Sequence, residues 1–331
     1  MSTFKAFEVS EVADKQFESA IVEKSIAALP AGDVLIEVHY SSLNYKDALS
    51  ASGNKGVTRN YPHTPGIDAA GVIAESSDSS LPVGTEVIVI GYDLGMNTAG
   101  GFGQFIRVPS QWVIPLPDGL SLRESMILGT AGFTAALCLE KLLRNGLEDK
   151  QGEVLVTGAT GGVGIVAVAL LSRLGYRVVA STGKKESHDR LRSLGASDII
   201  ERNELSEANS KPMVAERWVG AVDVVGGDTL LNVIKGLRYG ASVAACGLVQ
   251  SPMFNASVFP FILRGVNLLG IDSVQLPLTH KKAVWNKLAS EWKLENLDKL
   301  STEIGFGELQ DCLQQVLAGR AEGRWVLNLK R

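Results

Sequence analysis

The sequence predicts an α/β fold in which a doubly wound parallel sheet is inserted into a β-rich domain. Strand and turn signals dominate the first part of the chain, and apolar strands then alternate with helical segments. One amphipathic helix (309–317) and one strand (325–329) follow, too little for a domain of their own. We therefore expect residues 1–126 and 297–331 to form one domain and 127–296 the other.

Composition favours two globular domains. The chain has 331 residues, and chains longer than about 250–300 residues usually divide into separate domains. Its formal net charge is -4, and lysines and arginines are dispersed, which is unlike a nucleic-acid-binding face. The longest apolar-plus-glycine stretch, Val163 to Leu171, is far shorter than the roughly 20 residues that a membrane span needs. We expect no nucleic-acid partner and no membrane association.

Cysteine and histidine usage bears on location and metal binding. Cys138, Cys246 and Cys312 lie far apart and form no Cys-x-x-Cys pair, which is typical of free thiols in a reducing cytoplasm. Residues 1–8 lack the apolar core of a signal peptide, so we expect a cytoplasmic protein. The four histidines stand at no ligand spacing from cysteine or acid, so we expect no metal site.

The elements follow in order. Segments 33–40, 71–74 and 85–90 are strands between glycine, proline and serine turns, as in a β-rich barrel or sandwich. After them come short branched strands that helices connect, which predicts a parallel sheet buried on both faces. The expected helices are 130–143, 164–174 and 188–194, and the expected strands are 153–157, 177–181, 198–200, 221–225, 242–246 and 268–271.

A glycine-rich turn follows the first of these buried strands. Gly158 and Gly161 permit a tight turn and a close approach to a pyrophosphate, and Gly164 lets the next helix pack against the strand. Ala159 interrupts the strict Gly-x-Gly-x-x-Gly spacing, but the strand–turn–helix context is that of a dinucleotide site. The alternative is a glycine turn with a structural role only.

The end of the second strand indicates which dinucleotide binds. It carries no acid to hold a ribose 2′-hydroxyl, whereas Thr182 and Lys184 can donate to a 2′-phosphate. Arg202, just past the next strand, can add a bidentate contact. The sequence therefore favours NADPH as the cofactor, with a solvated Lys184-Lys185 turn as the alternative.

Several segments resemble a known family. Ser41 to Leu49, Pro65 to Gly71, Gly129 to Ala135 and Gly158 to Gly164 resemble the zinc-independent quinone oxidoreductase branch of the medium-chain dehydrogenases/reductases. Ala244 to Leu248 and Pro260 to Val266 are similar to the acrylyl-CoA reductase group of that branch. The zinc-dependent relatives keep a cysteine near the position of Asn44 and a Gly-His-Glu at Gly66-Ile67-Asp68, and this chain has neither.

The resemblance implies a Rossmann domain inserted in a GroES-like catalytic domain, and a homodimer formed through the edge of the parallel sheet. It also implies NADPH-dependent reduction of an activated carbon–carbon double bond, with acrylyl-CoA giving propionyl-CoA. It places Tyr45 over the nicotinamide, Thr160, Gly161, Gly162 and Val163 at the pyrophosphate, Thr182, Gly183, Lys184 and Arg202 at the adenosine phosphate, and Leu248, Ile262 and Ser273 at the nicotinamide end.

The catalytic candidates are Tyr45, Asn44 and Asp68. Asn44 to Asp47 form a polar cluster before an expected helix, and Tyr45 is the candidate for positioning or protonation, with ordinary packing as the alternative. Asp68 is expected to orient Asn44 or Lys46, or to cap a helix.

The substrate contacts and the reaction leave alternatives open. Lys55 and Arg59 lie in one loop where they could meet the phosphates of CoA, unless this is simply a solvated loop, and Arg264 is an alternative contact. A quinone or free enone is the alternative acceptor. A third hypothesis is a non-catalytic NADPH-binding sensor or structural protein, against which the intact polar cluster argues.

Overall fold

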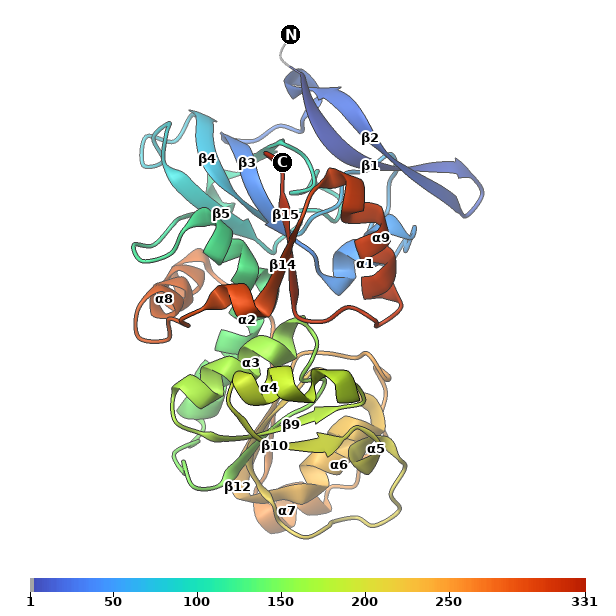
Figure 1. The fold of residues 1–331 in the computed structure, drawn as a ribbon, viewed down its shortest axis with the longest axis vertical. Coiled ribbons are helices and arrows are strands. Elements are labelled where there is room, and N and C mark those ends of the chain that lie inside the picture. Colours follow the sequence, from blue (N-terminus) through green and yellow to red (C-terminus); the bar gives the residue numbers. More distant parts are fainter. Residues whose placement is uncertain (1–2) are drawn as a thin grey trace. The chain divides into compact units, whose positions relative to one another are not determined.

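The computed structural model describes residues 3–331 and divides into two compact units (Figure 1). Unit 1 contains the chain up to Thr130 together with Val274–Glu291 and Glu295–Arg331. Unit 2 contains Ala131–Ser273 and Trp292–Leu294. The chain therefore leaves unit 1, forms unit 2, and returns to unit 1.

Unit 1 is built on β-sheet. One sheet is a hairpin of β1 and β2, and the other has the order β14-β15-β3-β4-β5-β7, with β6 paired to β3. Its elements are β1 (Thr3–Ala13), β2 (Gln16–Ser25), η1 (Ile26–Ala28), β3 (Val34–Ser42), α1 (Tyr45–Ala51), β4 (Asp68–Ser76), β5 (Glu86–Ile90), β6 (Phe105–Val108), η2 (Ser110–Trp112), β7 (Val113–Pro115), α8 (Leu278–Ala289), η4 (Leu297–Leu300), β14 (Ser301–Ile304), α9 (Phe306–Leu317) and β15 (Arg324–Asn328).

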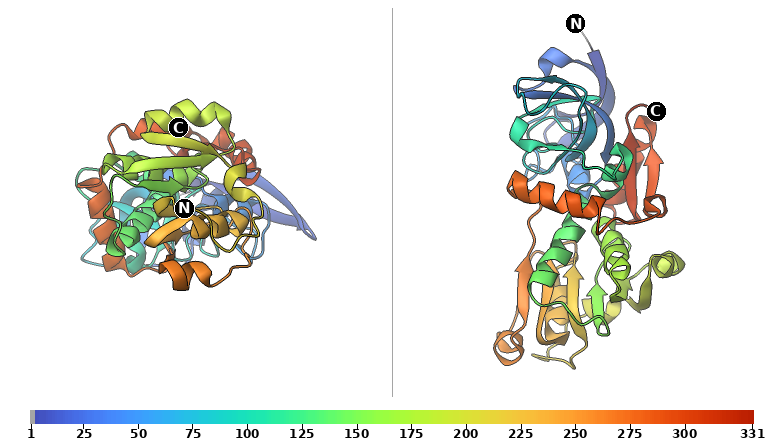
Figure 2. Two further views of the ribbon diagram at one scale, coloured as in Figure 1. Left: turned by 90° about the horizontal axis from the view of Figure 1, so that it is seen from below. Right: turned by 90° about the vertical axis from the view of Figure 1, so that its left-hand side faces the viewer.

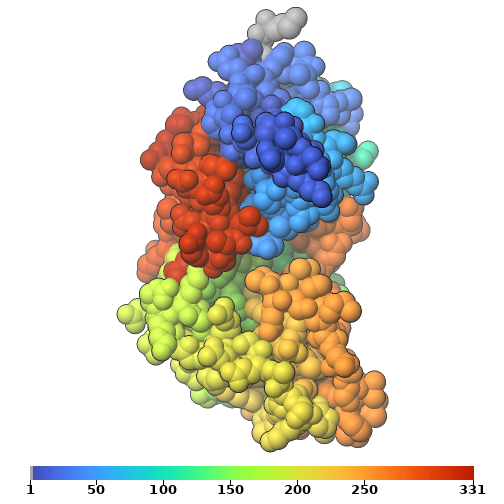
Figure 3. All heavy atoms as spheres, turned by 90° about the vertical axis from the view of Figure 1, so that its right-hand side faces the viewer, coloured from blue at the N-terminus to red at the C-terminus, as the bar shows by residue number. Residues whose placement is uncertain are grey.

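The last segment of the chain completes unit 1. Strand β15 pairs antiparallel with β3 and parallel with β14, so the C-terminal strands extend the sheet begun by the N-terminal ones. Helix α9 packs on α1, and its Leu309 and Leu313 join the same apolar core as Ile36 and Phe102. Figure 3 shows this C-terminal segment (red) on the surface beside residues of the first part of the chain (blue). The inferred return of the chain is thus present.

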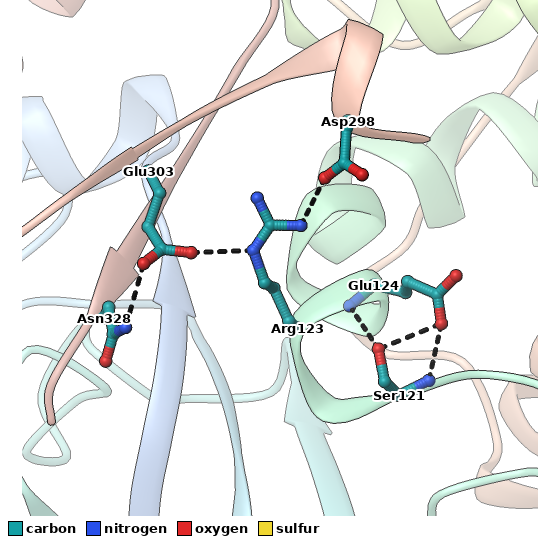
Figure 4. A network of polar contacts seen from close by, with 6 residues as sticks. All are labelled: Ser121, Arg123, Glu124, Asp298, Glu303 and Asn328. Atoms are coloured by element: carbon teal, nitrogen blue, oxygen red, sulfur yellow. Dashed lines mark hydrogen bonds and ion pairs between the residues drawn. The ribbon is translucent and has the colours of Figure 1, made fainter. Parts of the chain in front are cut away.

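Helix α2 (Leu122–Arg144) begins in unit 1 with a capping box that the sequence carries as Ser121-x-x-Glu124. The Ser121 N–H donates to the Glu124 carboxylate over 2.8 Å, and the Glu124 N–H donates to the Ser121 hydroxyl over 3.2 Å (Figure 4). Next to it, Arg123 donates to Glu303 on β14 over 2.7 Å and to Asp298 over 2.5 Å. The helix starts eight residues before the expected Thr130 because of this cap.

Helix α2 is also bent and buried. Gly129 has φ +52°, so the helix is interrupted there. Within residues 3–331 it is the one helix long and apolar enough to cross a membrane, but 83% of that apolar window is buried inside the protein. Packing in the core therefore accounts for its composition.

Unit 2 contains a six-stranded parallel sheet in the order β10-β9-β8-β11-β12-β13, with helices on both faces (Figure 2). This is the order of doubly wound dinucleotide-binding folds, with the switch point between β8 and β11. Its elements are β8 (Glu153–Val156), α3 (Gly162–Arg173), β9 (Arg177–Thr182), η3 (Lys185–Ser187), α4 (His188–Ser193), β10 (Ala196–Glu201), α5 (Asn203–Ser206), β11 (Trp218–Asp223), α6 (Gly227–Gly236), β12 (Leu237–Ala245), α7 (Phe259–Arg264) and β13 (Asn267–Gly270).

The division by contacts differs from the sequence-based domain limits at α8. That helix lies within 127–296, but it packs in unit 1. The buried Lys281 ammonium explains this: it donates to Ile90 O over 2.9 Å and to Val274 O over 3.0 Å, and it lies 3.4 Å from the centre of the Tyr92 ring. A buried ammonium needs such partners, and β5, the loop after it and the segment just before α8 supply them.

Candidate functional site

The glycine-rich turn connects β8 to α3 in unit 2. Gly158 has φ +56°, a conformation that side chains disfavour, and a Cβ on it would lie 2.5 Å from Val224. A Cβ on Gly164 would lie 2.3 Å from Gly158 O, so helix and turn are in direct contact. Gly161 precedes α3, and no side chain caps this helix. Its N–H groups thus remain available to a phosphate.

The residues expected at the adenosine phosphate lie together beyond the ends of β9 and β10. The Arg202 N–H donates to Thr182 O over 3.0 Å, and the Lys184 N–H donates to the Thr182 hydroxyl over 3.1 Å. The Arg202 guanidinium covers Gly183, where a Cβ would meet its carbon at 3.2 Å. Thr160 links this cluster to the glycine-rich turn, since its hydroxyl is 3.4 Å from that of Thr182.

Asp223 lies at the switch point of the sheet and was not among the expected residues. Its carboxylate accepts from the Thr157 hydroxyl over 2.6 Å and from the Gly226 N–H over 2.8 Å. Burial raises the pKa of Asp223, opposed by these hydrogen bonds. The contact ties the end of β11 to the end of β8, which fixes the floor of the expected nucleotide site.

In unit 1 the polar cluster is the start of helix α1. Asn44 is its N-cap, and Tyr45, Lys46 and Asp47 form its first turn rather than a loop before it. The Asn44 Nδ2 donates to Asp68 over 2.8 Å and to Asp47 over 3.2 Å. The Asn44 N–H also donates to Asp47, over 2.8 Å. The Asn44 amide therefore bridges two carboxylates.

Asp68 is fully buried as the first residue of β4, and its carboxylate makes contacts of both expected kinds. It orients Asn44, and it also accepts from the Thr130 N–H over 2.9 Å and the Thr130 hydroxyl over 2.5 Å. Thr130 is the first residue after the bend at Gly129. Asp68, on strand β4, therefore caps the second part of helix α2. Of the two residues that Asp68 was expected to orient, the contact is with Asn44 rather than Lys46.

A buried guanidinium from the far end of the chain completes this network. Arg324, the first residue of β15, donates to Ile127 O over 2.9 Å, to Leu43 O over 3.1 Å and to the Ser42 hydroxyl over 2.9 Å. The Ser42 hydroxyl in turn donates to Asp68 over 2.5 Å. The Arg324 guanidinium thus lies near two buried carboxylates, those of Asp68 and Asp47.

Asp47 is the titratable group whose pKa this environment changes most clearly. Full burial, with a smaller contribution from the Asp68 charge, raises the pKa of Asp47 to about 7. The Ile67 N–H, 2.8 Å away, and the Asn44 amide oppose the shift because they donate to its charged form. Burial lowers the pKa of the Arg324 guanidinium, and the charges of Asp68 and Asp47 oppose this shift.

These contacts separate the catalytic candidates. Asp68 is inaccessible, and both sides of the Asn44 amide are engaged, with its oxygen 3.5 Å from Arg324. Tyr45 is 46% exposed, so its phenol remains available to a ligand. Of the three candidates, Asn44 and Asp68 are therefore held in contacts within the protein, and Tyr45 is the exposed one.

The two basic residues of the loop after α1 differ in what they contact. The Lys55 ammonium lies 2.6 Å from Glu11 and 4.7 Å from the centre of the Tyr61 ring, so it holds the loop to the β1–β2 hairpin. Arg59 is exposed, and its backbone N–H donates to Asn97 over 3.2 Å. Arg59 is the better placed of the two for an external phosphate.

The structure does not bring Arg264 to the expected site. Its guanidinium donates to Lys235 O over 2.9 Å and to Val214 O over 2.7 Å, and its Nε lies 3.3 Å from Glu216. Lys235 precedes the start of β12, so Arg264 lies at the amino edge of the sheet, whereas ligands bind at the carboxyl edge. Arg264 is therefore a structural residue of unit 2.

The three residues expected at the nicotinamide end are spread over unit 2. Leu248 follows β12, is exposed, and passes close to Gly226, where a Cβ would lie 3.1 Å from its Cα. Ser273 follows β13 at the carboxyl edge of the sheet. Ile262 lies on α7, the helix that ends at Arg264, and is 69% exposed.

Sequence reasoning missed Arg324, Ser42, Thr130 and Asp223. Asp47 had a local signal, since Asn-x-x-Asp before an apolar run is a capping pattern, but Arg324 has none because its partners are about 280 residues away.

In the part of the chain that the structure describes, residues 3–331, no group of three or more His, Cys, Asp or Glu side chains could hold a metal ion.

Comparisons with known proteins match both units. A family model described as alcohol dehydrogenase GroES-like domain matches residues 30–118, and one described as zinc-binding dehydrogenase matches residues 162–290. The acrylyl-CoA reductase AcuI of Ruegeria pomeroyi is 43% identical, over 96% of this chain and 98% of its own length.

Two crystal structures resemble the chain over nearly its whole length. The yhdH oxidoreductase of Salmonella enterica, in complex with NADP, is 40% identical with a TM-score of 0.94, covering 98% of this chain and 99% of that one. The Bacillus subtilis protein yhfP, with NAD bound, is 42% identical with a TM-score of 0.96, covering 99% and 100%.

Proposed function

Because the chain belongs to the medium-chain dehydrogenase/reductase superfamily, we propose that it is an oxidoreductase that uses NADPH to reduce an activated carbon–carbon double bond, with acrylyl-CoA as substrate and propionyl-CoA as product. The identity of 43% to an acrylyl-CoA reductase over nearly the whole chain carries this proposal. The alternative acceptor, a quinone or free enone, would use the same fold and cofactor.

The reaction needs a hydride and a proton. NADPH, when bound, supplies the hydride to the carbon β to the thioester, and a proton from water or an acid reaches the α carbon, so the double bond becomes a single bond. The protein's part is to orient the cofactor and the thioester and to donate hydrogen bonds where the enolate charge develops. The Tyr45 phenol is our candidate for contact with the reacting groups, since it is exposed on an anchored helix turn.

The cluster at the ends of β9 and β10 supports NADPH. Thr182, Lys184 and the Arg202 guanidinium lie around Gly183 and offer hydroxyl and cationic donors to a 2′-phosphate. The Salmonella relative holds NADP in its crystal structure. We propose that Thr160, Gly161, Gly162 and Val163 bind the pyrophosphate on the N-terminus of α3, and that Leu248 and Ser273, which follow β12 and β13 at the carboxyl edge of the sheet, bound the nicotinamide end. Ile262 lies on α7 together with Arg264 and is not part of this set.

The substrate assignment is tested by comparing acceptors. We expect purified protein to oxidise NADPH with acrylyl-CoA, with a kcat/KM well above that for simple quinones. A quinone kcat/KM equal to or above that for acrylyl-CoA would contradict the assignment and favour the alternative acceptor. Binding of NADPH without turnover across enones and enoyl-CoAs would favour a non-catalytic sensor.

The CoA moiety is tested at Arg59. We propose that Arg59 contacts its phosphates, since the guanidinium is exposed whereas Lys55 is engaged with Glu11. Arg59→Ala is expected to raise the KM for acrylyl-CoA about tenfold and to leave the KM for a free enone unchanged. Arg107→Ala, which removes an ion pair with Glu75 on another strand, is the control and should change neither KM.

We propose that two copies associate through the open edge of the unit 2 sheet. Strand β13 pairs with β12 on one side only, and Val258, Ile262 and Leu263 on and before α7 expose large apolar surfaces. Ile262→Asp with Leu263→Asp is expected to convert a dimer to a monomer in sedimentation experiments. A monomeric wild-type protein would contradict the proposal.

We propose a cytoplasmic location. The three cysteines are free thiols, and two of them, Cys138 and Cys312, are buried. Free thiols persist in reducing compartments. Fractionation of cells that express the tagged protein tests this, and recovery in the membrane or extracellular fraction would contradict it.

A further inference from the structure

The Asn44 side chain is held from three elements at once. Its Nδ2 donates to Asp47 on its own helix and to Asp68 on β4, and its oxygen faces the Arg324 guanidinium on β15. An amide with both ends engaged in this way has one orientation. The proposed role of Tyr45 depends on this, because Tyr45 is the next residue in the chain.

Arg324 acts on the backbone as well as on side chains. It is 2% exposed, and it donates to Leu43 O, the carbonyl just before Asn44, and to the Ser42 hydroxyl. Asp47 fixes the other side of the same turn, since it accepts from the N–H groups of Asn44 and Ile67. Both ends of the segment from Ser42 to Asp47 are therefore anchored by charged groups.

This arrangement differs from what packing alone requires. Well-packed apolar residues stabilise an interior at least as well as buried ions do. Here charged groups from α1, β4 and β15 converge on the residue before Tyr45, and they fix one geometry of the first turn of α1. A buried network that is fully satisfied restricts its members to a single arrangement.

We infer that Arg324 and Asp47 are positioning residues for the reaction: through the Asn44 side chain they hold the first turn of α1, and with it the Tyr45 phenol, in the orientation that the substrate requires. The inference rests on the proposed function for its kinetic test. It concerns unit 1 only, whereas the glycine-rich turn and the cluster around Gly183 belong to unit 2. Substitutions in the unit 1 network should therefore lower the turnover number and leave the affinity for the nucleotide nearly unchanged.

The test uses four variants of the full-length protein: Arg324→Met, Arg324→Lys, Asp47→Asn and Ser42→Ala. With acrylyl-CoA, Arg324→Met and Asp47→Asn are expected to lower kcat at least tenfold, while the Kd for NADPH changes less than threefold. Arg324→Lys should recover part of the loss, because one ammonium can replace some of the donors. Ser50→Ala is the matched control: its hydroxyl is buried on α1 and 2.7 Å from that of Thr58, outside the network. Its kcat should stay within twofold of wild type.

Each outcome decides the inference. If Arg324→Met does not fold, Ser42→Ala, which removes one hydroxyl and no charge, is expected to lower kcat about threefold or more. A kcat within twofold of wild type in all soluble network variants would overturn the inference. If the wild type does not reduce acrylyl-CoA, the proposed function fails, and the positioning role is measured by amide hydrogen exchange at residues 45–47. Faster exchange in Ser42→Ala than in Ser50→Ala supports it, and equal exchange overturns it.

Discussion

The guanidinium of Arg202 lies against Gly183, so closely that a Cβ on this glycine would be 3.2 Å from the guanidinium carbon. Gly183 thus provides a backbone surface on which the cation rests between the ends of β9 and β10. A 2′-phosphate at this position would meet Arg202 and Lys184 together.

Replacing Lys184 by Ala is expected to weaken NADPH far more than NADH. A charge-assisted bond contributes about 1.5–3 kcal/mol, so the Kd for NADPH should rise roughly 10-fold to 100-fold while that for NADH barely changes. Fluorescence titration with both nucleotides measures this. Lys185→Ala is the control, because Lys185 is exposed and lies 3.9 Å from Glu201. Equal losses for the two nucleotides in Lys184→Ala would refute the 2′-phosphate role.

Gly129→Ala is expected to be among the most destabilising single changes in unit 1. Gly129 has φ +52°, and a Cβ there would lie 2.4 Å from the Ser42 hydroxyl and 2.6 Å from Asp68. Its ψ of -159° places Gly129 in a region that is essentially restricted to glycine. Strain of about 1–3 kcal/mol and overpacking of about 1–3 kcal/mol should together lower the free energy of unfolding by about 2–6 kcal/mol.

Gly146→Ala separates these two contributions to the Gly129→Ala effect. Gly146 has φ +87° but open space around it, so the same substitution there should cost about 1–2 kcal/mol, from strain alone. Urea unfolding of both variants gives the comparison. Similar losses at the two glycines would mean that the buried network tolerates the added methyl group.

The raised pKa of Asp47 predicts a pH-dependent stability. Below the usual value of 3.8 both states hold the proton, and the contribution of Asp47 to stability is fully present. Between that value and about 7 the folded state keeps the proton that the unfolded state has lost, so the free energy of unfolding falls as pH rises, by at most about 1.4 kcal/mol per unit. Above about 7 the loss is complete.

The difference in unfolding free energy between the wild type and Asp47→Asn, measured in urea from pH 5 to 8.5, tests this linkage. The variant cannot titrate at this position. The unfolding free energy of the wild type should therefore fall relative to that of the variant up to about pH 7, and above that pH the difference should stay constant. Parallel curves over the whole range would show that Asp47 has an ordinary pKa.

Lys281→Met is expected to loosen the attachment of α8 to unit 1. The ammonium of Lys281 donates to the buried Ile90 O and to the part-buried Val274 O, and the substitution removes both hydrogen bonds, although Val274 O still accepts from the Tyr92 N–H over 3.1 Å. Because a hydrogen bond to a charged group contributes about 1.5–3 kcal/mol, we expect a loss of about 2–5 kcal/mol in the free energy of unfolding. Lys282→Met, at the exposed neighbouring position of the same helix, should change it by less than about 0.5 kcal/mol. A loss at position 281 no greater than that at position 282 would contradict the anchoring role.

Local patterns predicted the nucleotide-binding half of the molecule well. The strand, glycine turn and helix from Glu153 to Arg173 use signals within twenty-odd residues, and they form β8 and α3 as expected. By contrast, the sequence did not predict the hairpin strand β2. None of its side chains is fully buried, so it lacks the alternation of apolar and polar residues that marks a strand.

The polar network of unit 1 depends on contacts that no local pattern contains. Asn44 and Asp68 could be singled out from their segments, but the carboxylate that caps α2 from β4 required the fold. Arg324 stands in a terminal strand whose sequence resembles many others. Its importance comes from burial beside partners far along the chain, which only the sheet pairing of β15 with β3 reveals.

The placement of β15 also bears on the order in which the two units can form during synthesis. The seven-stranded sheet of unit 1 includes residues 301–304 and 324–328, which leave the ribosome after all six strands of unit 2, since those strands precede residue 271. Domains generally fold as units while the chain emerges. Unit 2 can therefore close while unit 1 still lacks an edge of its sheet. The cation that lies near Asp47 and Asp68 arrives only with Arg324, so these two carboxylates on α1 and β4 lack their buried cation until the segment that contains β15 has been made.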